Sequence, residues 1–302
     1  DMALFSRARA DGELRSRLVA ATFYPPDSAP ELLAEVATAK AAYNDDQLNA
    51  GPVKFYIDDV IEPHTAAMLA PYANAPGTGG LYWPPDEFAQ LIIRVEELGL
   101  QAFVHATGDR GIRTVLDAIQ AARRAHGPLD SRHQIIHLEC LDPADIPRFR
   151  ELGVIACMQP RHCAPDLVAE WRANVGPARE RYAWAMRSLA DTGAALAFSS
   201  DWNVAEMDPM IGIYTALTRA DLSGGGGWNT GETLDLDRTL RAYTYGGAYA
   251  NFAEHNRGTL RAGKLADVIV LSEDLHQIPE QQIPRTTVTH TIVGGQIVHR
   301  QA

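Results

Sequence analysis

The sequence predicts an α/β fold in which helices alternate with the strands of a parallel sheet, followed by a small all-β unit. Three observations lead to this fold class. Short apolar segments rich in β-forming residues alternate with segments of helical period along most of the 302 residues. These short segments are nearly continuous in apolar residues, as is typical of strands buried on both faces. After a glycine-rich loop the alternation ends, and short β-type segments follow.

Six segments before that loop have the strand pattern. They are residues 18–24, 53–57, 102–105, 134–138, 154–158 and 195–199. Repeated strand–helix–strand units predict parallel pairing with right-handed crossovers. Because a closed (β/α)8 barrel needs eight strands, six strands leave two alternatives: an open, doubly wound sheet, or a barrel that lacks its first two units. The chain starts at Asp1-Met2 without an initiator-like residue, which favours the second alternative.

The segments between the strands have the pattern of amphipathic helices. Residues 86–98 carry apolar side chains at helical spacing, among them Phe88 and Ile92. Gly99 follows as a helix stop. The same pattern recurs in residues 108–125, 146–152 and 182–191.

A run of four glycines, Gly224 to Gly227, is interpreted as a flexible loop. A phosphate-binding loop is not expected there, because no Lys-Ser/Thr pair opens a helix behind it. The next helix is expected over residues 236–252, with Asp235 as its N-cap. Gly294-Gly295 predicts a hairpin turn within the terminal β unit. The strands of that unit are expected at residues 268–271, 287–293 and 296–298.

Charge and composition exclude several classes of protein. The 38 acidic residues outnumber the 27 basic ones, for a net charge of −11, so binding to nucleic acid or an anionic membrane by charge is not expected. No apolar run reaches the roughly 18 residues of a membrane span. Cys140, Cys157 and Cys163 cannot all pair, which indicates a reducing compartment. We therefore expect a cytoplasmic protein, with export left open by the unusual start of the chain.

Four polar residues lie at or near the carboxyl ends of different predicted strands: Lys54, His105, His137 and Asp201. Taken singly, each has an ordinary structural explanation, such as a snorkelling lysine or a turn aspartate. Together they predict one site, because the active sites of α/β barrels are built from these strand ends. Two histidines and a carboxylate suit a divalent transition metal such as Zn²⁺. His133 precedes His137 by four residues and is expected on the same strand face.

Several stretches of sequence resemble the metal-dependent amidohydrolase superfamily, and most of all the YtcJ-like branch of amidohydrolase family 3. Four of them contain the polar residues above: Val-Lys-Phe-Tyr-Ile-Asp at 53–58, His-Ala-Thr-Gly-Asp-Arg at 105–110, Ile-His-Leu-Glu at 136–139 and Ser-Ser-Asp-Trp at 199–202. The segments at 153–160 and 258–271 resemble that branch as well, and the second contains Gly-Lys-Leu-Ala-Asp.

The resemblance implies a TIM-type (β/α)8 barrel that lacks its first strands in this chain, plus the C-terminal part of a small β-sandwich. The expected domains are residues 1–255 for the partial barrel and residues 256–302 for the sandwich segment. The family also has a His-x-His pair on its first strand, and this sequence contains none. By the family's order that pair lies upstream of Asp1, so we expect a longer parent protein.

The resemblance also implies roles for the four polar residues. Lys54 fits the place of a lysine that can be carboxylated and bridge two metals, and His105 and His137 fit the ligands of the second metal. Asp201 fits the aspartate that touches the first metal and is catalytic as the proton shuttle. The expected cofactor is one or two divalent ions, with zinc favoured. The implied reaction is hydrolysis of an amide-type, non-peptide C–N bond by a metal-bound hydroxide.

Substrate contacts are expected from Gln159, Arg161, His162 and Trp202. Arg161 has the chemistry to clamp a carboxylate, although a solvated loop arginine is the commoner structure. The sequence differs from the family's usual pattern at Ile136, where a glutamate is usual.

Two alternative functions stay open. The first is hydrolysis of lactones or phosphotriesters, which the same set of metal-binding residues also serves. The second is a catalytically incomplete fragment or binding module, because the chain lacks the His-x-His pair. The expected partner is a small-molecule, amide-like substrate, and a homo-oligomer stays open.

Overall fold

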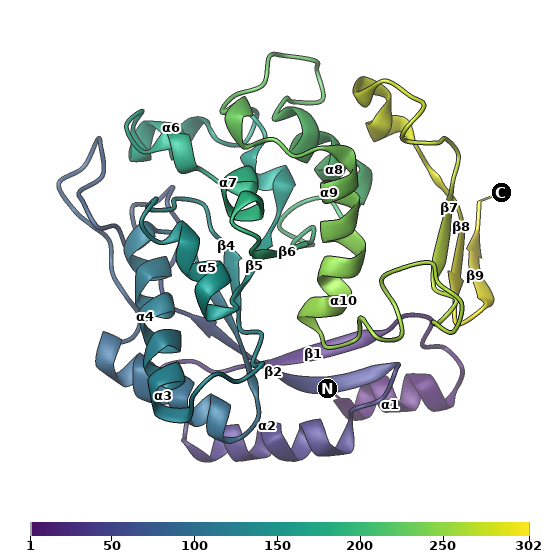
Figure 1. Cartoon of the computed structure of the whole chain (residues 1–302), viewed down its shortest axis with the longest axis horizontal. Coiled ribbons are helices and arrows are strands. Elements are labelled where there is room, and N and C mark those ends of the chain that lie inside the picture. The colour runs from purple at the N-terminus through teal and green to yellow at the C-terminus, as the bar shows by residue number, and fades with distance from the viewer. Residues whose placement is uncertain (1, 302) are drawn as a thin grey trace.

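The computed structural model describes residues 2–301, and its main feature is one six-stranded sheet (Figure 1). The strands pair in chain order, β1 to β6, and every neighbouring pair is parallel. Their carboxyl ends therefore lie along one edge of the sheet, and the predicted α/β class is confirmed. The strands are β1 (Leu18–Phe23), β2 (Leu48–Tyr56), β3 (Gln101–Ala106), β4 (Gln134–His137), β5 (Ile155–Met158) and β6 (Ala195–Phe198).

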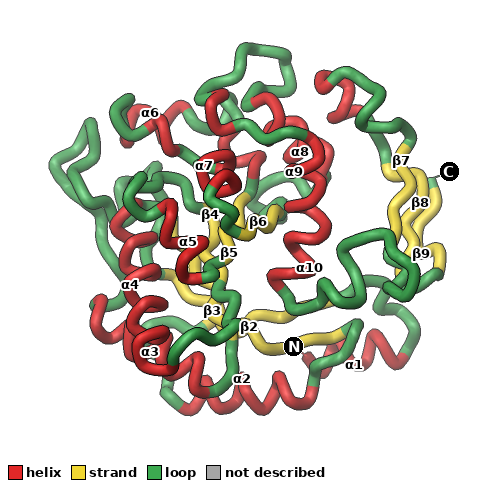
Figure 2. The backbone as a smooth tube through the Cα atoms, in the orientation of Figure 1, coloured by secondary structure: helices red, strands yellow, loops and turns green. Residues whose placement is uncertain are grey.

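Helices follow the strands in alternation, and Figure 2 shows them around the sheet. The predicted stop at Gly99 is confirmed, since this residue has a left-handed φ of 63° directly after α3 and Leu98. None of the helices within residues 2–301 is long and apolar enough to cross a membrane. The helices are α1 (Met2–Ala10), α2 (Glu31–Ala42), α3 (Pro85–Glu97), α4 (Asp109–His126), α5 (Ile146–Leu152), α6 (Ala169–Val175), α7 (Met186–Asp191), α8 (Pro209–Thr218), α9 (Leu236–Arg241) and α10 (Gly247–Ala250).

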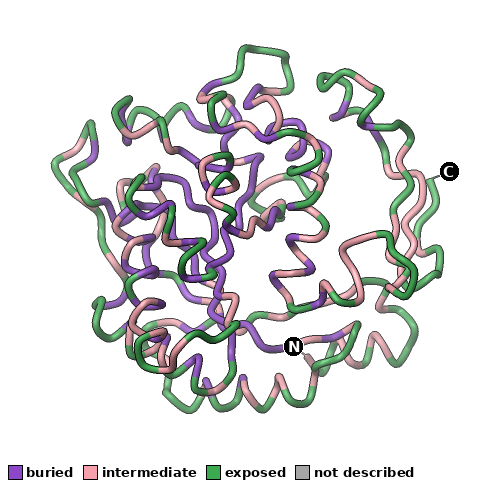
Figure 3. The backbone as a smooth tube through the Cα atoms, in the orientation of Figure 1, coloured by how far each residue is buried: buried purple, intermediate pink, exposed green. Residues whose placement is uncertain are grey.

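The core lies between the sheet and the helices packed on it, where Figure 3 shows buried backbone. On β2, Val53 and Phe55 are fully buried, and the Phe55 ring meets Phe88 of α3 edge to face at 5.7 Å between centroids. Because side chains alternate along a strand, Lys54 and Tyr56 point to the opposite face. That face leads to the candidate site.

The helix predicted over residues 236–252 is interrupted. Asp235 caps α9 as expected, accepting a hydrogen bond from the Arg238 amide at 2.8 Å. A π-helical turn, Ala242–Gly246, then separates α9 from α10. A Cβ atom at Gly246 would lie only 2.1 Å from the Leu196 carbonyl of β6, so this turn packs directly on the sheet. Such contact depends on tertiary packing, which helical period does not encode.

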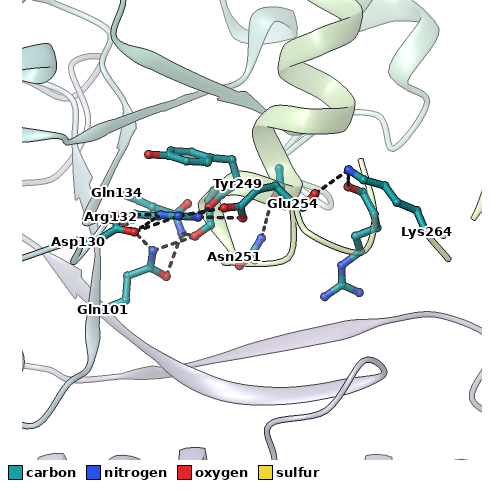
Figure 4. Close-up of polar contacts among 11 residues, drawn as sticks. Gln101, Asp130, Arg132, Gln134, Tyr249, Asn251, Glu254 and Lys264 are labelled. Atoms are coloured by element: carbon teal, nitrogen blue, oxygen red, sulfur yellow. Dashed lines mark hydrogen bonds and ion pairs between the residues drawn. The ribbon is translucent and has the colours of Figure 1, made fainter. Parts of the chain in front are cut away.

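A polar network closes the amino-terminal edge of the sheet near β3, β4 and α10 (Figure 4). Arg132 donates two hydrogen bonds to the Glu254 carboxylate at 2.9 Å each and one to the Tyr249 carbonyl at 2.8 Å. Its guanidinium also lies over the rings of Tyr249 and Phe252, 3.9 and 4.5 Å from their centroids. Gln101, at the start of β3, donates to the Ala250 carbonyl at 2.8 Å.

The predicted β unit forms a separate antiparallel sheet of β7 (Val268–Leu271), β8 (Val288–Val293) and β9 (Gln296–Arg300). Gly294 and Gly295 have φ of 56° and 81°, so the predicted hairpin turn is confirmed. Asp267 connects this sheet to the segment before β1, because both its oxygens accept from Arg17 at 2.6 and 2.8 Å.

Candidate metal centre

The carboxyl edge of the sheet brings the predicted histidines together. Tyr56 of β2 is the register partner of His105 on β3, and Ala106 is the partner of His137 on β4. The rings of His105 and His137 are 4.5 Å apart between centroids. Two of the four predicted residues are therefore in contact at this edge.

The backbone at the end of β4 directs His137 toward its neighbours. His137 and Leu138 have left-handed φ values of 79° and 55°, which turn the chain sharply out of the strand. The expectation that His133 shares the face of His137 is wrong. His133 instead bonds to Glu96 of α3 at 3.1 Å and accepts from the Ala102 amide at 2.9 Å.

Three side chains gather their ligand atoms closely enough to hold a metal ion: His137, His162 and Asp201. One ligand atom from each lies within 4.8 Å of the other two. Asp201 Oδ2 is 4.0 Å from His137 Nδ1 and 3.7 Å from His162 Nε2. Asp201 itself follows β6 with a left-handed φ of 60°. His162 lies in the 3-10 turn Pro160–Cys163 directly after β5.

His162 was expected as a substrate contact and not as a ligand. Its place after a strand end is the same signal that identified His105, but the resemblance assigned the ligand roles elsewhere. His105 lies beside the three-residue group, with its ring against that of His137, and is not one of the three. Lys54 Nζ lies over the Tyr56 ring, 4.6 Å from its centroid.

Burial keeps the site histidines neutral. Burial lowers the pKa of His105 to about 4, against a hydrogen bond to the Asp59 carbonyl and with a contribution from Lys54. The pKa of His137 is also well below its usual value, chiefly because of burial. A neutral imidazole has a lone pair for a metal at physiological pH. Burial likewise lowers the pKa of Lys54 to about 8 and raises that of Asp201, which His162 and Lys54 oppose.

Gln159 orients His137. The Gln159 amide nitrogen donates to Ser199 Oγ at 2.9 Å, which leaves its oxygen to accept from His137 Nδ1 at 2.9 Å. A proton on Nδ1 leaves the lone pair on Nε2, so His137 would bind an ion through Nε2 and not through the Nδ1 atom that lies 4.0 Å from Asp201. Such fixing of the tautomer is usual for metal-binding histidines. Gln159 is buried, and its role was expected as substrate binding.

The residues present fit a divalent metal. His162 Nε2 is buried and has no hydrogen-bond partner among the described residues, although a buried polar atom normally has one. Two neutral imidazoles and a carboxylate are the donor set that zinc and similar ions prefer. The unpaired Nε2 of His162 and the chemistry of the three donors therefore both fit a bound divalent ion.

Arg161 is already engaged by two carboxylates. It forms two hydrogen bonds of 2.8 Å to Asp166 and one of 3.0 Å to Glu206. It thereby joins the turn that carries His162 to the loop that follows Asp201. Trp202, in that same loop, has 66% of its surface exposed. A substrate contact by Arg161 or Trp202 stays a prediction.

Comparisons with known proteins identify relatives along nearly the whole chain. A family model of the amidohydrolase family matches residues 1–299. The chain is 30% identical to LONG AFTER FAR-RED 3 of Arabidopsis thaliana, over 95% of this chain and 49% of that protein. It is 31% identical to YtcJ of Bacillus subtilis (strain 168), over 83% and 47%. It is 25% identical to N-substituted formamide deformylase of Arthrobacter pascens, over 82% and 45%.

The similar solved structures include a metal-dependent hydrolase. An uncharacterized metal-dependent hydrolase from Pyrococcus furiosus superposes with a TM-score of 0.72 at 26% identity, over 87% of this chain and 52% of that one. The chain thus spans about half the length of the relatives it matches. Because the family model covers nearly every residue, the chain belongs to the amidohydrolase family.

Proposed function

We propose that this protein is a metal-dependent hydrolase that cleaves amide-type, non-peptide C–N bonds. The observation that carries the proposal is the convergence of His137, His162 and Asp201 at the carboxyl edge of a parallel sheet, in a chain of the amidohydrolase family. The Arthrobacter pascens relative, whose name describes an activity on N-substituted formamides, supports amides as the substrate class.

The proposal extends to the fold of the whole protein. We propose that residues 2–255 are part of a (β/α)8 barrel and residues 256–301 part of a β-sandwich. Within the described residues, β1 and β6 are the two edges of an open sheet, and the Pyrococcus furiosus structure is about twice as long as the part it shares with this chain.

The side chains would divide the work as follows. His137, His162 and Asp201 would hold a divalent ion, with Lys54 and His105 beside it. When bound, such an ion acts as a Lewis acid on a carbonyl and lowers the pKa of water. Asp201 would accept a proton at its carboxylate and return it to the leaving nitrogen. Its carboxylate is reachable because about a third of the side chain is exposed. Gln159 would keep His137 in one tautomer.

The first test is the metal content of the purified chain, measured by elemental mass spectrometry after incubation with Zn²⁺. We expect bound zinc that decreases in His137→Ala and His162→Ala. His299→Ala, which removes an exposed histidine of β9, is the control and should keep the wild-type content. Equal zinc in all four proteins would contradict the proposed ligands.

The second test is a panel of N-substituted amides, lactones and phosphotriesters, given to the chain and to the longest natural protein that contains it. We expect zinc-dependent turnover of amides. Asp201→Asn should keep the circular dichroism spectrum and lose turnover, because an amide cannot shuttle the proton. Turnover of only lactones or phosphotriesters, or of nothing by either protein, would overturn the proposal.

A further inference from the structure

We propose that Phe23 and Tyr56 form a subsite for a planar aromatic group of the substrate, so that the preferred amides carry an aryl substituent near the scissile bond. This inference rests on the proposed function, because it assigns a substrate class to the same site. It concerns the inner face of β1 and β2, beside the metal centre.

The two side chains share one face of the sheet with Lys54. Tyr56 follows Lys54 by two residues in β2, and alternation puts both on the same side. Phe23, the last residue of β1, is the register partner of Lys54. Phe55, between Lys54 and Tyr56, points the other way and is fully buried against α3. The inner face is therefore separate from the part of the core that contains Phe55.

An unbroken row of rings leads from this face into the metal centre. The Phe23 ring meets the Tyr56 ring edge to face, with centroids 5.5 Å apart. The Tyr56 ring lies 4.6 Å from His105, and His105 lies 4.5 Å from His137. A substrate group that rests against Tyr56 is therefore separated from His105 by one ring, that of Tyr56. It is separated from the proposed ligand His137 by two rings, those of Tyr56 and His105.

The outer members of the row are exposed in the part of the chain that the structure describes. Phe23 is 52% exposed and Tyr56 is 38% exposed, whereas the aromatic side chains in the core are buried. Neighbouring exposed aromatic rings at the mouth of a site are typical of pockets that bind apolar groups.

The chemistry of the row favours a flat, uncharged group. Edge-to-face and offset contacts between rings contribute beyond the area that they bury, and Phe23 already presents this geometry to Tyr56. Lys54 Nζ lies over the Tyr56 ring, 4.6 Å from its centroid. A neutral aryl ring on the substrate would extend the row of rings.

The test compares three amides that differ in one substituent: N-phenylacetamide, N-cyclohexylacetamide and N-methylacetamide. Binding to the metal-free chain is measured by titration calorimetry, and kcat and KM of the zinc-loaded protein are measured separately. We expect the phenyl amide to bind more tightly than the cyclohexyl amide, which is similar in size but not flat.

Variants assign the preference to the two rings. Tyr56→Ala and Phe23→Ala should each weaken binding of the phenyl amide by about 3- to 10-fold and leave the methyl amide unchanged. Tyr56→Phe should keep the wild-type preference because it keeps the ring. Leu260→Ala, at an exposed apolar side chain of the C-terminal segment, is the control and should bind all three amides as the wild type does.

The two proposals fail in different ways. A phenyl preference that disappears in Tyr56→Ala, without turnover of any amide, would support the subsite and overturn the hydrolase. Turnover of all three amides with equal KM, or a phenyl preference unchanged in both alanine variants, would overturn the subsite and leave the hydrolase standing.

Discussion

At the candidate metal centre, the structure adds His162 to the expected residues. A further residue, Gln159, orients His137. Gln159 connects Ser199 of the β6 end to His137 of the β4 end through its two amide atoms. Such outer hydrogen bonds fix the ring of a metal-binding histidine and hold its free lone pair in place. The candidate site therefore depends on more than its three proposed ligands.

Gln159→Leu should weaken zinc binding by about 10- to 100-fold, the usual cost of losing such a partner. Ser199→Ala removes only the outer contact and should cost less. Titration calorimetry with Zn²⁺ measures both. A larger loss in Ser199→Ala than in Gln159→Leu would contradict the proposed role of Gln159.

Glu96 on α3 predicts how stability changes with pH. Burial acts to raise the pKa of this carboxyl, but hydrogen bonds from His133 and Ser131 outweigh it and bring the pKa to about 2. The unfolded value is about 4.3. Because the folded pKa is lower, this stabilisation is complete above about pH 5 and is lost as the pH falls toward 2.

Glu96→Gln should therefore reduce the acid sensitivity of the protein. Urea unfolding between about pH 5 and pH 2 should show that the variant loses roughly 1–3 kcal/mol less than the wild type. Glu151→Gln, at an exposed carboxyl of α5, is the control and should follow the wild-type curve. Parallel curves for wild type and Glu96→Gln would refute this explanation.

At the scale of elements, Asp58 holds β2, β3 and α4 together just below the site. Its carboxylate accepts from the amides of Ala67, Thr107 and Gly108 at 2.9–3.1 Å. Thr107 follows His105 by two residues, so the clamp also fixes the end of β3. A Cβ atom at Gly111, in the first turn of α4, would lie 2.6 Å from Asp58 Oδ2.

Gly111→Ala and Gly247→Ala should change stability in opposite directions. Alanine is favoured over glycine in a helix by about 1 kcal/mol, and a Cβ at Gly247 of α10 meets nothing within 4 Å. Gly247→Ala should therefore stabilise by up to that amount. Gly111→Ala should destabilise by about 1–3 kcal/mol, because it crowds a carboxylate that three amides hold. Denaturant unfolding measures the stability of both variants. If both substitutions stabilise the protein, the Asp58 side chain can shift away from a Cβ atom at position 111 at little cost.

At the scale of the whole molecule, Arg132 fastens the last helix to the sheet. Its planar guanidinium pairs with Glu254 through two hydrogen bonds (Figure 4). It also stacks on the rings of Tyr249 and Phe252. Only 11% of its side chain is exposed. A lysine at this position would keep the positive charge. It could form neither the paired hydrogen bonds to Glu254 nor the stacking on the two rings.

Arg132→Lys should thus destabilise the protein by about 1–3 kcal/mol. It should also speed amide hydrogen exchange in α10 more than in β3 or β4. Arg238→Lys, at a pair with Asp191 in which both side chains are about half exposed, should leave the free energy of unfolding nearly unchanged. Equal losses in the two variants would mean that charge alone matters at Arg132.

The sequence by itself determined the six parallel strands, several of the helices and the strand ends that carry Lys54, His105, His137 and Asp201. These features follow from local patterns, because a strand buried on both faces has a nearly continuous apolar sequence. The carboxyl ends of parallel strands then lie at one edge of the sheet. It missed helices such as α2 and α8, whose apolar residues are not confined to one clear stripe.

Only the tertiary structure decided which side chains meet. His162 joins His137 and Asp201, His133 is diverted to Glu96, and Arg161 pairs with Asp166 and Glu206. The physical reason is that the direction of a side chain at a strand end depends on left-handed turns such as those at His137 and Asp201. It depends equally on hydrogen-bond partners that are 20 to 45 positions away in the chain, and no local pattern encodes them.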